Sequence, residues 1–255
     1  MSDENKELVE GKDNLPMEYD FEQMSGANED FHQDDLTTPF LKVLQKLSPE
    51  LDTVDGAKAG MFYNTSTQKL YEGVQQVVPV AYARQFLEWV PREQGGGFRG
   101  EVSMKEALEL DQNERGQGVT DEGNLVVDTR LHYVLHITDE GAFPCIVTFK
   151  STGIKRSKNW NDIANSIIFE GSKGPYNPPW FSHIYNLEAT LEQKNDDKWH
   201  LMKASKLAKV DDPELIRSAM AFRELVKSNG VKVDHEKGQD SASSNVDDAY
   251  DDAGF

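Results

Sequence analysis

The feature that most restricts the fold is a long extended stretch, residues 74–92, which reads VQQVVPVAYARQFLEWVPR. Side chains alternate between the two faces of a strand. One face then carries Val78, Val80, Tyr82, Arg84, Phe86 and Glu88, and the other carries Val77, Pro79, Ala81, Ala83, Gln85, Leu87 and Trp89. Neither face is purely apolar. A strand of this length is expected to bend or to pass from one sheet surface to another, as in a small barrel.

The segments around this strand predict more strands and a few helices. Apolar spacing and turn residues indicate three hairpins, over residues 61–71, 130–151 and 181–207. They also indicate helices over residues 38–48, 155–169 and 212–230, and a short helix followed by an acidic loop over residues 103–123. The pattern fits a β-rich α+β fold, namely an OB-fold-like five-stranded barrel with helical insertions.

Charge is separated along the chain, whose formal net charge is −18. Residues 1–38 hold 12 acidic and 2 basic side chains, and residues 234–255 hold 7 and 1, which leaves 26 and 24 for residues 39–233. The two ends are also poor in apolar side chains, so burial cannot offset the entropy of ordering them. We expect a disordered acidic arm over residues 1–36, a folded domain over residues 37–232 and a disordered acidic tail over residues 233–255.

Motifs for catalysis are scarce. The glycines at 95–97 lack the Gly-Lys-Ser/Thr of a phosphate-binding loop, and the sequence has no Gly-x-Ser-x-Gly or His-Glu-x-x-His motif. His132 and His136 lie four residues apart in a predicted strand, where a structural role is favoured over a metal site. We expect no enzymatic activity, no metal and no cofactor.

Cellular location is predicted from two features. The acidic N-terminus, MSDENKELVEGKDNL, does not resemble a signal peptide, and no apolar run is long enough to span a membrane. We expect a cytoplasmic protein that does not associate with membranes.

The single cysteine, Cys145, lies in the apolar run FPCIVTF and is expected to be a buried small hydrophobe.

Aromatic rings alternate with cationic side chains along the predicted strands and loops. Rings accept stacked bases of any sequence, while Lys and Arg follow the phosphates, so this combination is typical of surfaces that bind single-stranded nucleic acid. Residues 142–210 add a local excess of ten basic over six acidic side chains. The candidate contacts are Tyr63, Lys69, Tyr71, Tyr82, Arg84, Trp89, Arg92, Phe98, Arg99, Lys155, Arg156, Lys158 and Tyr176.

The last nine residues, DDAYDDAGF, combine acidity with a terminal ring. Four carboxylates and the chain terminus imitate a short run of phosphates and can compete for a cationic groove. A ring beside a terminal carboxylate fits a partner pocket with an apolar floor and a cationic rim. The candidate partner-binding residues are Asp247, Asp248, Tyr250, Asp251, Asp252 and Phe255.

These tail residues, together with the block TPFLKVLQKLSPEL…GMFYN…VVPVAYARQFLEWVPREQGGGFRG over residues 38–100, resemble the single-stranded DNA-binding proteins of lytic tailed bacteriophages. The resemblance implies an OB-fold domain that coats and protects single-stranded DNA in phage replication or recombination. It also implies that the acidic tail recruits phage or host replication, recombination or RNA polymerase proteins, in the cytoplasm of the host.

Two other classes of function stay open. Glu101, Asp111 and Asp128 are candidate ligands of a metal-dependent nuclease, which would show turnover that depends on Mg²⁺ or Mn²⁺. A protein-binding transcription coactivator, or a DNA mimic, would act through the acidic ends without affinity of the central domain for DNA.

Overall fold

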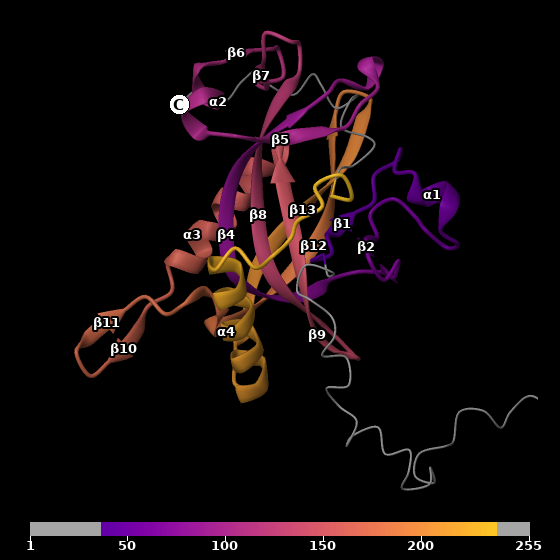
Figure 1. The fold of residues 1–255 in the computed structure, drawn as a ribbon. Helices are drawn as coiled ribbons and strands as arrows, with labels where there is room; N and C mark the ends of the chain where they lie inside the picture. Colours follow the sequence, from indigo (N-terminus) through magenta and orange to yellow (C-terminus); the bar gives the residue numbers. More distant parts are fainter. Residues whose placement is uncertain (1–36, 239–255) are drawn as a thin grey trace, which may run out of the picture. The chain divides into compact units, whose positions relative to one another are not determined.

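The computed structural model describes residues 37–238, which hold every strand and helix discussed below (Figure 1). The predicted acidic arm, residues 1–36, and the predicted tail from residue 239 onward lie outside the described residues, as do all six candidate residues for partner binding. None of the described helices is long and apolar enough to cross a membrane.

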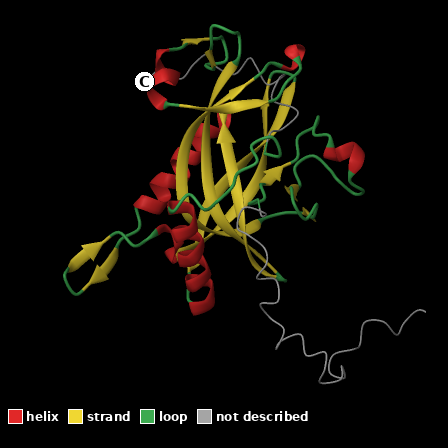
Figure 2. Ribbon diagram, in the orientation of Figure 1, coloured by secondary structure: helices red, strands yellow, loops and turns green. Residues whose placement is uncertain are grey.

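The main sheet has eight antiparallel strands, of which two, β6 and β7, are short and six are curled into a half-barrel (Figure 2). These strands are β4 (Gln75–Trp89), β5 (Phe98–Val102), β8 (Leu125–Thr138), β9 (Gly141–Lys150), β12 (His183–Lys194) and β13 (Asp197–Lys209). Strand β4 pairs with β8 along one edge, and along its other edge it pairs first with β12 and then with β5. Strand β8 likewise pairs with β9 over its later residues. Because the long strands change partners along their length, the sheet bends.

The half-barrel does not close, because no pairing within residues 37–238 joins β13 to β9. The prediction of a β-rich α+β fold is confirmed, whereas the closed five-stranded barrel is wrong. Closure is unnecessary, since other elements bury both faces of the sheet. The helices are α1 (Glu50–Thr53), α2 (Met104–Glu109), α3 (Ile154–Asn165) and α4 (Pro213–Lys227).

Short strands and single helical turns complete the described part of the chain. One small sheet has the order β1-β2-β3, and β10 and β11 form a separate hairpin. The short strands are β1 (Leu41–Val43), β2 (Phe62–Asn64), β3 (Leu70–Tyr71), β6 (Asp111–Gln112), β7 (Gly118–Val119), β10 (Phe169–Gly171) and β11 (Gly174–Tyr176). The turns are the 3-10 helices η3 (Arg92–Gln94), η4 (Ser151–Gly153) and η5 (Trp180–Ser182).

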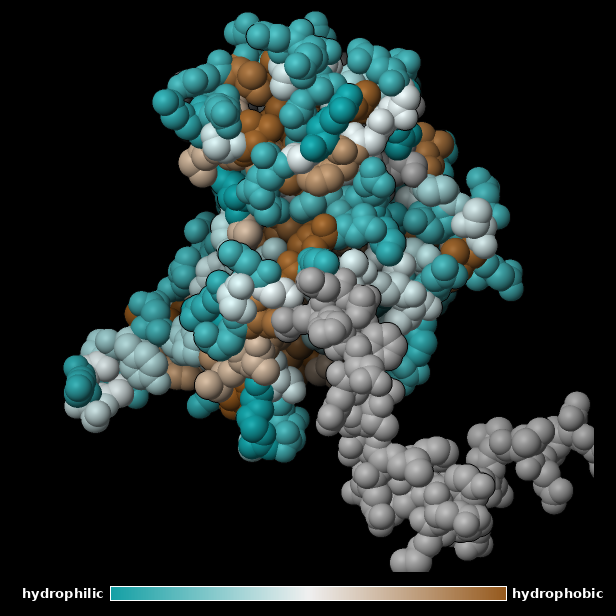
Figure 3. Space-filling model, in the orientation of Figure 1, coloured by the Kyte–Doolittle hydropathy of each residue, from teal (hydrophilic) through white to brown (hydrophobic). Residues whose placement is uncertain are grey.

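Two apolar cores lie on opposite faces of the sheet. On one face, Trp160 of α3 packs with Val134, Val147 and Tyr185 of the sheet and with Phe62 of β2. On the other face, Phe222 of α4 packs with Tyr133 and Leu131 of β8. Outside these cores, Figure 3 shows a largely hydrophilic surface with small, separate apolar patches. The cores fix the long strands that carry the site described below.

Most predicted elements are confirmed, including the three hairpins and the helices that correspond to α2, α3 and α4. Asp212 caps α4, since its carboxylate accepts a hydrogen bond from the Glu214 backbone N–H at 2.8 Å, ahead of Pro213. Asn229 follows the helix in the left-handed conformation with φ 56°.

Two local predictions are wrong. Residues 38–48 contain strand β1, Leu41–Val43, and no helix, because Phe40 packs in one core while Leu41 and Val43 pack in the other, and burial on both sides imitates helical spacing. The alternation along β4 is broken at Val80, where the pairing with β8 shifts between Pro79 and Ala81. Residues after this irregularity therefore point to the faces opposite to those predicted.

Candidate functional site

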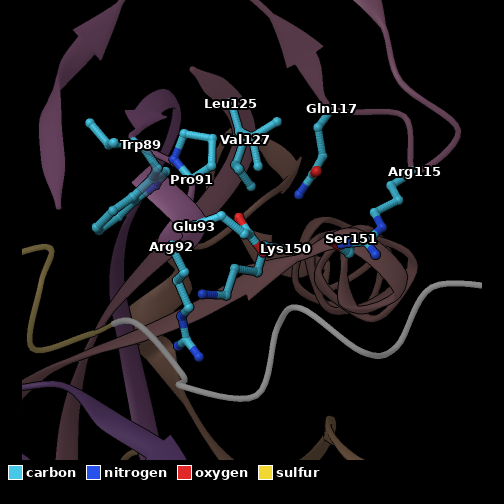
Figure 4. Close-up of a pocket in the computed structure, with 11 residues that line it drawn as sticks. Trp89, Pro91, Arg92, Glu93, Arg115, Gln117, Leu125, Val127, Lys150 and Ser151 are labelled. Atoms are coloured by element: carbon cyan, nitrogen blue, oxygen red, sulfur yellow. The ribbon is translucent and has the colours of Figure 1, made fainter. Parts of the chain in front are cut away.

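A small cavity lies where β4 ends, beside the start of β8 and the end of β9. Its volume is about 110 Å³. Figure 4 shows the side chains around it, which come from β4, η3, the β6–β7 loop, β8, the end of β9 and the residue that follows it. The lining consists of Trp89, Val90, Pro91, Arg92, Glu93, Arg115, Gln117, Leu125, Val127, Lys150 and Ser151.

Strand register brings the floor of the cavity together. Trp89 pairs with Leu125, and Lys150, the last residue of β9, pairs with Thr129 two residues beyond Val127. Ser151 follows in the left-handed region with φ 50°, a conformation that costs energy for a residue other than glycine, and it turns the chain from β9 into η4. This turn keeps Lys150 and Ser151 at the cavity.

The β6–β7 loop adds the third wall. Its conformation is held by Asn113, whose side-chain oxygen accepts hydrogen bonds from the backbone N–H groups of Arg115 and Gln117, both at 3.0 Å. The Asn113 amide also donates to the Gln117 side-chain oxygen at 3.0 Å. An Asn side chain that bonds to the backbone in this way fixes a tight turn, so Arg115 is placed by local structure.

The lining is positively charged. Arg92, Arg115 and Lys150 face one carboxylate, Glu93, so the formal charge of the lining is +2. Each cation belongs to a different element, since Arg92 lies in η3, Arg115 in the β6–β7 loop and Lys150 at the end of β9. Arg92 is exposed, and its backbone carbonyl accepts a hydrogen bond from the Gly95 N–H at 3.0 Å. The cavity is therefore suited to an anionic group.

Aromatic side chains adjoin the cavity. The ring of Trp89, in its wall, lies 5.1 Å from the ring of Phe98 on β5, and His235 packs on Phe98 at 4.9 Å. Burial lowers the pKa of His235, and Asp234 opposes the shift. The Phe98 backbone N–H donates to the Glu236 carboxylate at 3.3 Å. The His235 ring and the Glu236 carboxylate therefore lie against Phe98, beside the cavity.

The segment that carries His235 crosses the same face of the sheet. Residues 234–238 border a second hollow of about 20 Å³, which shares Trp89 and Lys150 with the first cavity. Gly238 lies directly on the ring of Phe40, where an added Cβ would come within 2.7 Å of the ring. His235 and Gly238 therefore border the second hollow, beside the first cavity.

Three of the predicted contact residues, Trp89, Arg92 and Phe98, come together here, and the exposed Arg99 follows on β5. Three other predicted contacts belong to the β2–β3 hairpin and lie away from the cavity. Tyr63 is buried, Lys69 forms an ion pair with Glu140 at 2.5 Å, and Tyr71 packs edge-on against His136. Burial raises the pKa of both tyrosines. Tyr63, Lys69 and Tyr71 therefore contribute to packing and do not line the cavity.

Tyr82 and Arg84 belong to a partly buried charge network on the face covered by α3. The Arg84 guanidinium donates to Asp128 at 2.7 Å, and Arg130 donates both to Asp128 at 2.8 Å and to the Tyr82 hydroxyl at 2.9 Å. The tyrosine ring also contacts Trp180 at 6.1 Å. This network stabilises the pairing of β4 with β8.

The remaining predicted contacts are spread over α3 and the β10–β11 hairpin. Lys155 and Lys158 are exposed on α3, and Arg156 pairs with Glu192 at 2.5 Å. Tyr176 is exposed on the hairpin, edge-on to Phe169 at 5.9 Å. The structure therefore does not gather them with Trp89.

Sequence reasoning missed Arg115, Lys150, Gln117 and Ser151. Arg115 lies in a segment that reads as an acidic loop, and a short hairpin there was not foreseen. Lys150 ends the apolar run of β9, and a cation that directly follows a buried strand is a usable signal. The partnership of the two with Arg92 depends on pairing between distant strands, which a linear pattern does not contain.

His132, His136 and Cys145 are buried, and the burial predicted for Cys145 is confirmed. Burial lowers the pKa of His132 to about 3 and that of His136 to about 4, and each ring nitrogen Nε2 has a polar partner, Ser157 at 2.8 Å and Gln75 at 3.1 Å. Burial raises the pKa of Cys145 to about 12. Residues 37–238 contain no group of three or more His, Cys, Asp or Glu side chains placed to hold a metal ion.

Comparison with known proteins gives a family. The model of the family described as "Pam3 phage gp34-like protein" matches residues 9–232, so the chain belongs to this bacteriophage protein family. No curated protein and no solved structure matches the chain significantly.

Proposed function

We propose that this phage-family protein binds single-stranded DNA and protects it during phage replication or recombination, without catalysing a reaction. The observation that carries the proposal is the convergence of Arg92, Arg115 and Lys150 on one cavity whose wall, Trp89, continues into the ring of Phe98. Phosphates enter the cavity and a base stacks on the neighbouring ring, which is the division of labour found in proteins that bind single strands.

The expected contact energies are large enough to give measurable affinity for a single strand. One base stacked on an aromatic ring contributes roughly 1–3 kcal/mol, and each phosphate contact adds a salt-dependent contribution through counterion release. His235 covers one face of Phe98. An incoming base would take the place of this imidazole, and a phosphate would take the place of the Glu236 carboxylate, so the segment over residues 234–238 opens when the strand binds.

The acidic, Phe-terminated end of the chain adds partner recruitment to the proposal. Asp247, Asp248, Asp251 and Asp252, with Phe255, form a docking peptide for replication, recombination or RNA polymerase proteins of the phage or its host. The same carboxylates compete with the strand for cationic side chains. Deleting residues 247–255 should therefore leave DNA binding intact or tighter, and a marked loss of binding would contradict the competition.

The test is a fluorescence anisotropy titration of labelled oligo(dT) at low salt with the full chain. We expect Arg92→Gln to weaken binding about tenfold, because one charge-assisted contact is lost. Lys227→Gln, which removes an exposed cation from α4, should leave the affinity unchanged. The absence of any binding at low salt would refute the proposal.

Two further experiments distinguish a single-strand-binding protein from a nuclease and from a protein that binds RNA or duplex DNA. Incubation of the strand with Mg²⁺ or Mn²⁺ followed by gel analysis should show full-length DNA, and shortened products would indicate a nuclease. Competition with RNA and duplex DNA then defines the ligand, since discrimination between the two single strands requires contacts to the 2′-hydroxyl. Duplex DNA that competes as well as oligo(dT) would contradict a single-strand site.

A further inference from the structure

We infer that the β10–β11 hairpin and the end of β13 form a second surface for single-stranded DNA, away from the cavity. This surface, the hairpin patch, consists of Phe169, Tyr176, Lys206 and Lys209. The inference rests on the proposed function, because its ligand is the DNA strand proposed there. It adds a separate binding surface, which is carried by strand register, ring contacts and charge.

A β-bulge in β13 places two lysines on one face of the sheet. Lys209 pairs with His183 of β12. Lys206 pairs with Tyr185, the second residue after His183, so Leu207 has no partner in β12. Without this extra residue, two side chains three positions apart would point to opposite faces. Because opposite residues of an antiparallel pair share a face, Lys206 and Lys209 both lie on the face of His183.

The rings of the hairpin lie beside these lysines. The Lys209 ammonium lies 4.9 Å from the centre of the Phe169 ring. The same ring lies 5.7 Å from the His183 ring and 5.9 Å from the Tyr176 ring. Burial, followed by the charges of Lys206 and Lys209, lowers the pKa of His183, so both charges act at this group of rings. The bulge and the hairpin thus bring two cations next to two aromatic rings.

The hairpin patch is accessible to a ligand. Tyr176 is 48% exposed, Lys206 and Lys209 are exposed, and neither lysine side chain forms an ion pair within the described part of the chain. Glu170, the acidic residue of the hairpin, follows Phe169 on β10, so its side chain points to the opposite face of the hairpin. A base can therefore stack on the Tyr176 ring while neighbouring phosphates meet two uncompensated cations.

Hydrogen bonds at the end of α3 fix the hairpin, which projects from the half-barrel in Figure 1. The Asn177 amide, directly after Tyr176, donates to the backbone carbonyl of Asn165 at 2.7 Å. It also donates to the carbonyl of Ile167 at 3.0 Å. The Trp180 indole N–H donates to the Asn165 side-chain oxygen at 3.1 Å. Because the hairpin is held before a DNA strand arrives, less ordering entropy opposes binding.

The hairpin patch and the cavity lie at different ends of β4. The first residues of this strand, Gln75–Val77, pair with β12 close to the patch, and its last residue, Trp89, lines the cavity. The 15 residues of β4 span about 50 Å at roughly 3.3 Å per residue. The two surfaces are therefore separate, and one long DNA strand can contact both.

The experiment measures the salt dependence of the affinity of the full chain for oligo(dT) of about 30 nucleotides, longer than the roughly 16 that one domain covers. Each phosphate contact that is lost makes the slope of log K against log salt shallower by roughly 0.7. We expect a change of about 0.7 for Lys206→Gln and about 1.4 for Lys206→Gln/Lys209→Gln. Lys203→Gln is the matched control and should leave the slope unchanged, since exposed Lys203 pairs with Glu188 and points to the other face of β13.

Ring variants test the stacking contact. Tyr176→Ala should weaken binding about fivefold or more, the loss of one stacked base, whereas Tyr176→Phe keeps the ring and should preserve the affinity.

Three outcomes would overturn the inference. A wild-type slope in both lysine variants would do so while the proposed function stands. A labelled DDAYDDAGF peptide that loses affinity for the double variant, with oligo(dT) binding unchanged, would assign the hairpin patch to the acidic tail instead. If the wild-type chain binds no strand at low salt, the proposed function and the inference both fail.

Discussion

Replacing Asp128 with asparagine tests the interpretation that Tyr82 and Arg84 serve the fold. The Asp128 carboxylate accepts hydrogen bonds from Arg84 at 2.7 Å and from Arg130 at 2.8 Å. The side chain of Arg130 is 10% exposed and that of Asp128 is 23% exposed. An asparagine at this position would keep the size of the side chain but would leave two guanidinium groups without their counter-charge.

The expected cost follows from this burial. Removing one partner of a buried ion pair costs roughly 3–5 kcal/mol, because the other charge stays buried. Arg84 is 31% exposed, so water screens part of the loss, and we expect Asp128→Asn to lower the free energy of unfolding by about 2–3 kcal/mol.

Urea unfolding of the full chain, followed by tryptophan fluorescence, measures this loss. Glu140→Gln is the matched control, since it removes a carboxylate from an exposed pair with Lys69, and it should cost less than about 1 kcal/mol. Binding of oligo(dT) by Asp128→Asn should stay within about twofold of wild type under native conditions. A stability change below about 0.5 kcal/mol, or a large loss of binding with native stability, would refute the structural role.

Three other predictions follow from the positions of Phe98, of His132 and His136, and of Cys145. Phe98→Ala should weaken oligo(dT) binding by about 1–3 kcal/mol, whereas Phe143→Ala, which removes an exposed ring at the opposite end of β9, should not; equal effects of the two variants would contradict a stacking role. The folded-state pKa values of His132 and His136, about 3 and about 4, lie below the ordinary 6.5, so their contribution to stability is complete above pH 6.5 and is lost as the pH falls toward those values. The free energy of unfolding should fall by up to about 1.4 kcal/mol per pH unit for each histidine, and pH-independent stability between pH 7 and 5 would refute their buried, neutral state. Cys145 should react with a thiol reagent only after unfolding, and rapid reaction of the native protein would contradict its burial.

Local patterns were enough to find most strands and helices, because hairpin turns and helix caps depend on neighbouring residues. The Asn195–Asp196 turn between β12 and β13 and the Asp212 cap of α4 are examples. The strand β1 was mistaken for a helix, since its burial on both sides depends on cores built by distant segments. The irregularity at Val80 likewise depends on the pairing of β4 with β8.

For the same reason, the sequence predicted only some of the residues that line the cavity. Trp89, Arg92 and Phe98 are near one another in sequence, so a linear pattern of rings and cations found them. Arg115 and Lys150 reach the cavity only through the β6–β7 loop and the pairing of β9 with β8. Conversely, Arg84 looked like a phosphate contact because its partner Asp128 is 44 residues away along the chain.

The salt dependence of oligo(dT) affinity tests the central claim most directly. For a single strand, log K falls with log salt concentration with a slope of roughly −0.7 for each phosphate contact. The double variant Arg92→Gln/Lys150→Gln should therefore make the slope shallower by about 1.4, while Lys227→Gln leaves it at the wild-type value. An unchanged slope in the double variant would show that the strand does not place its phosphates in this cavity.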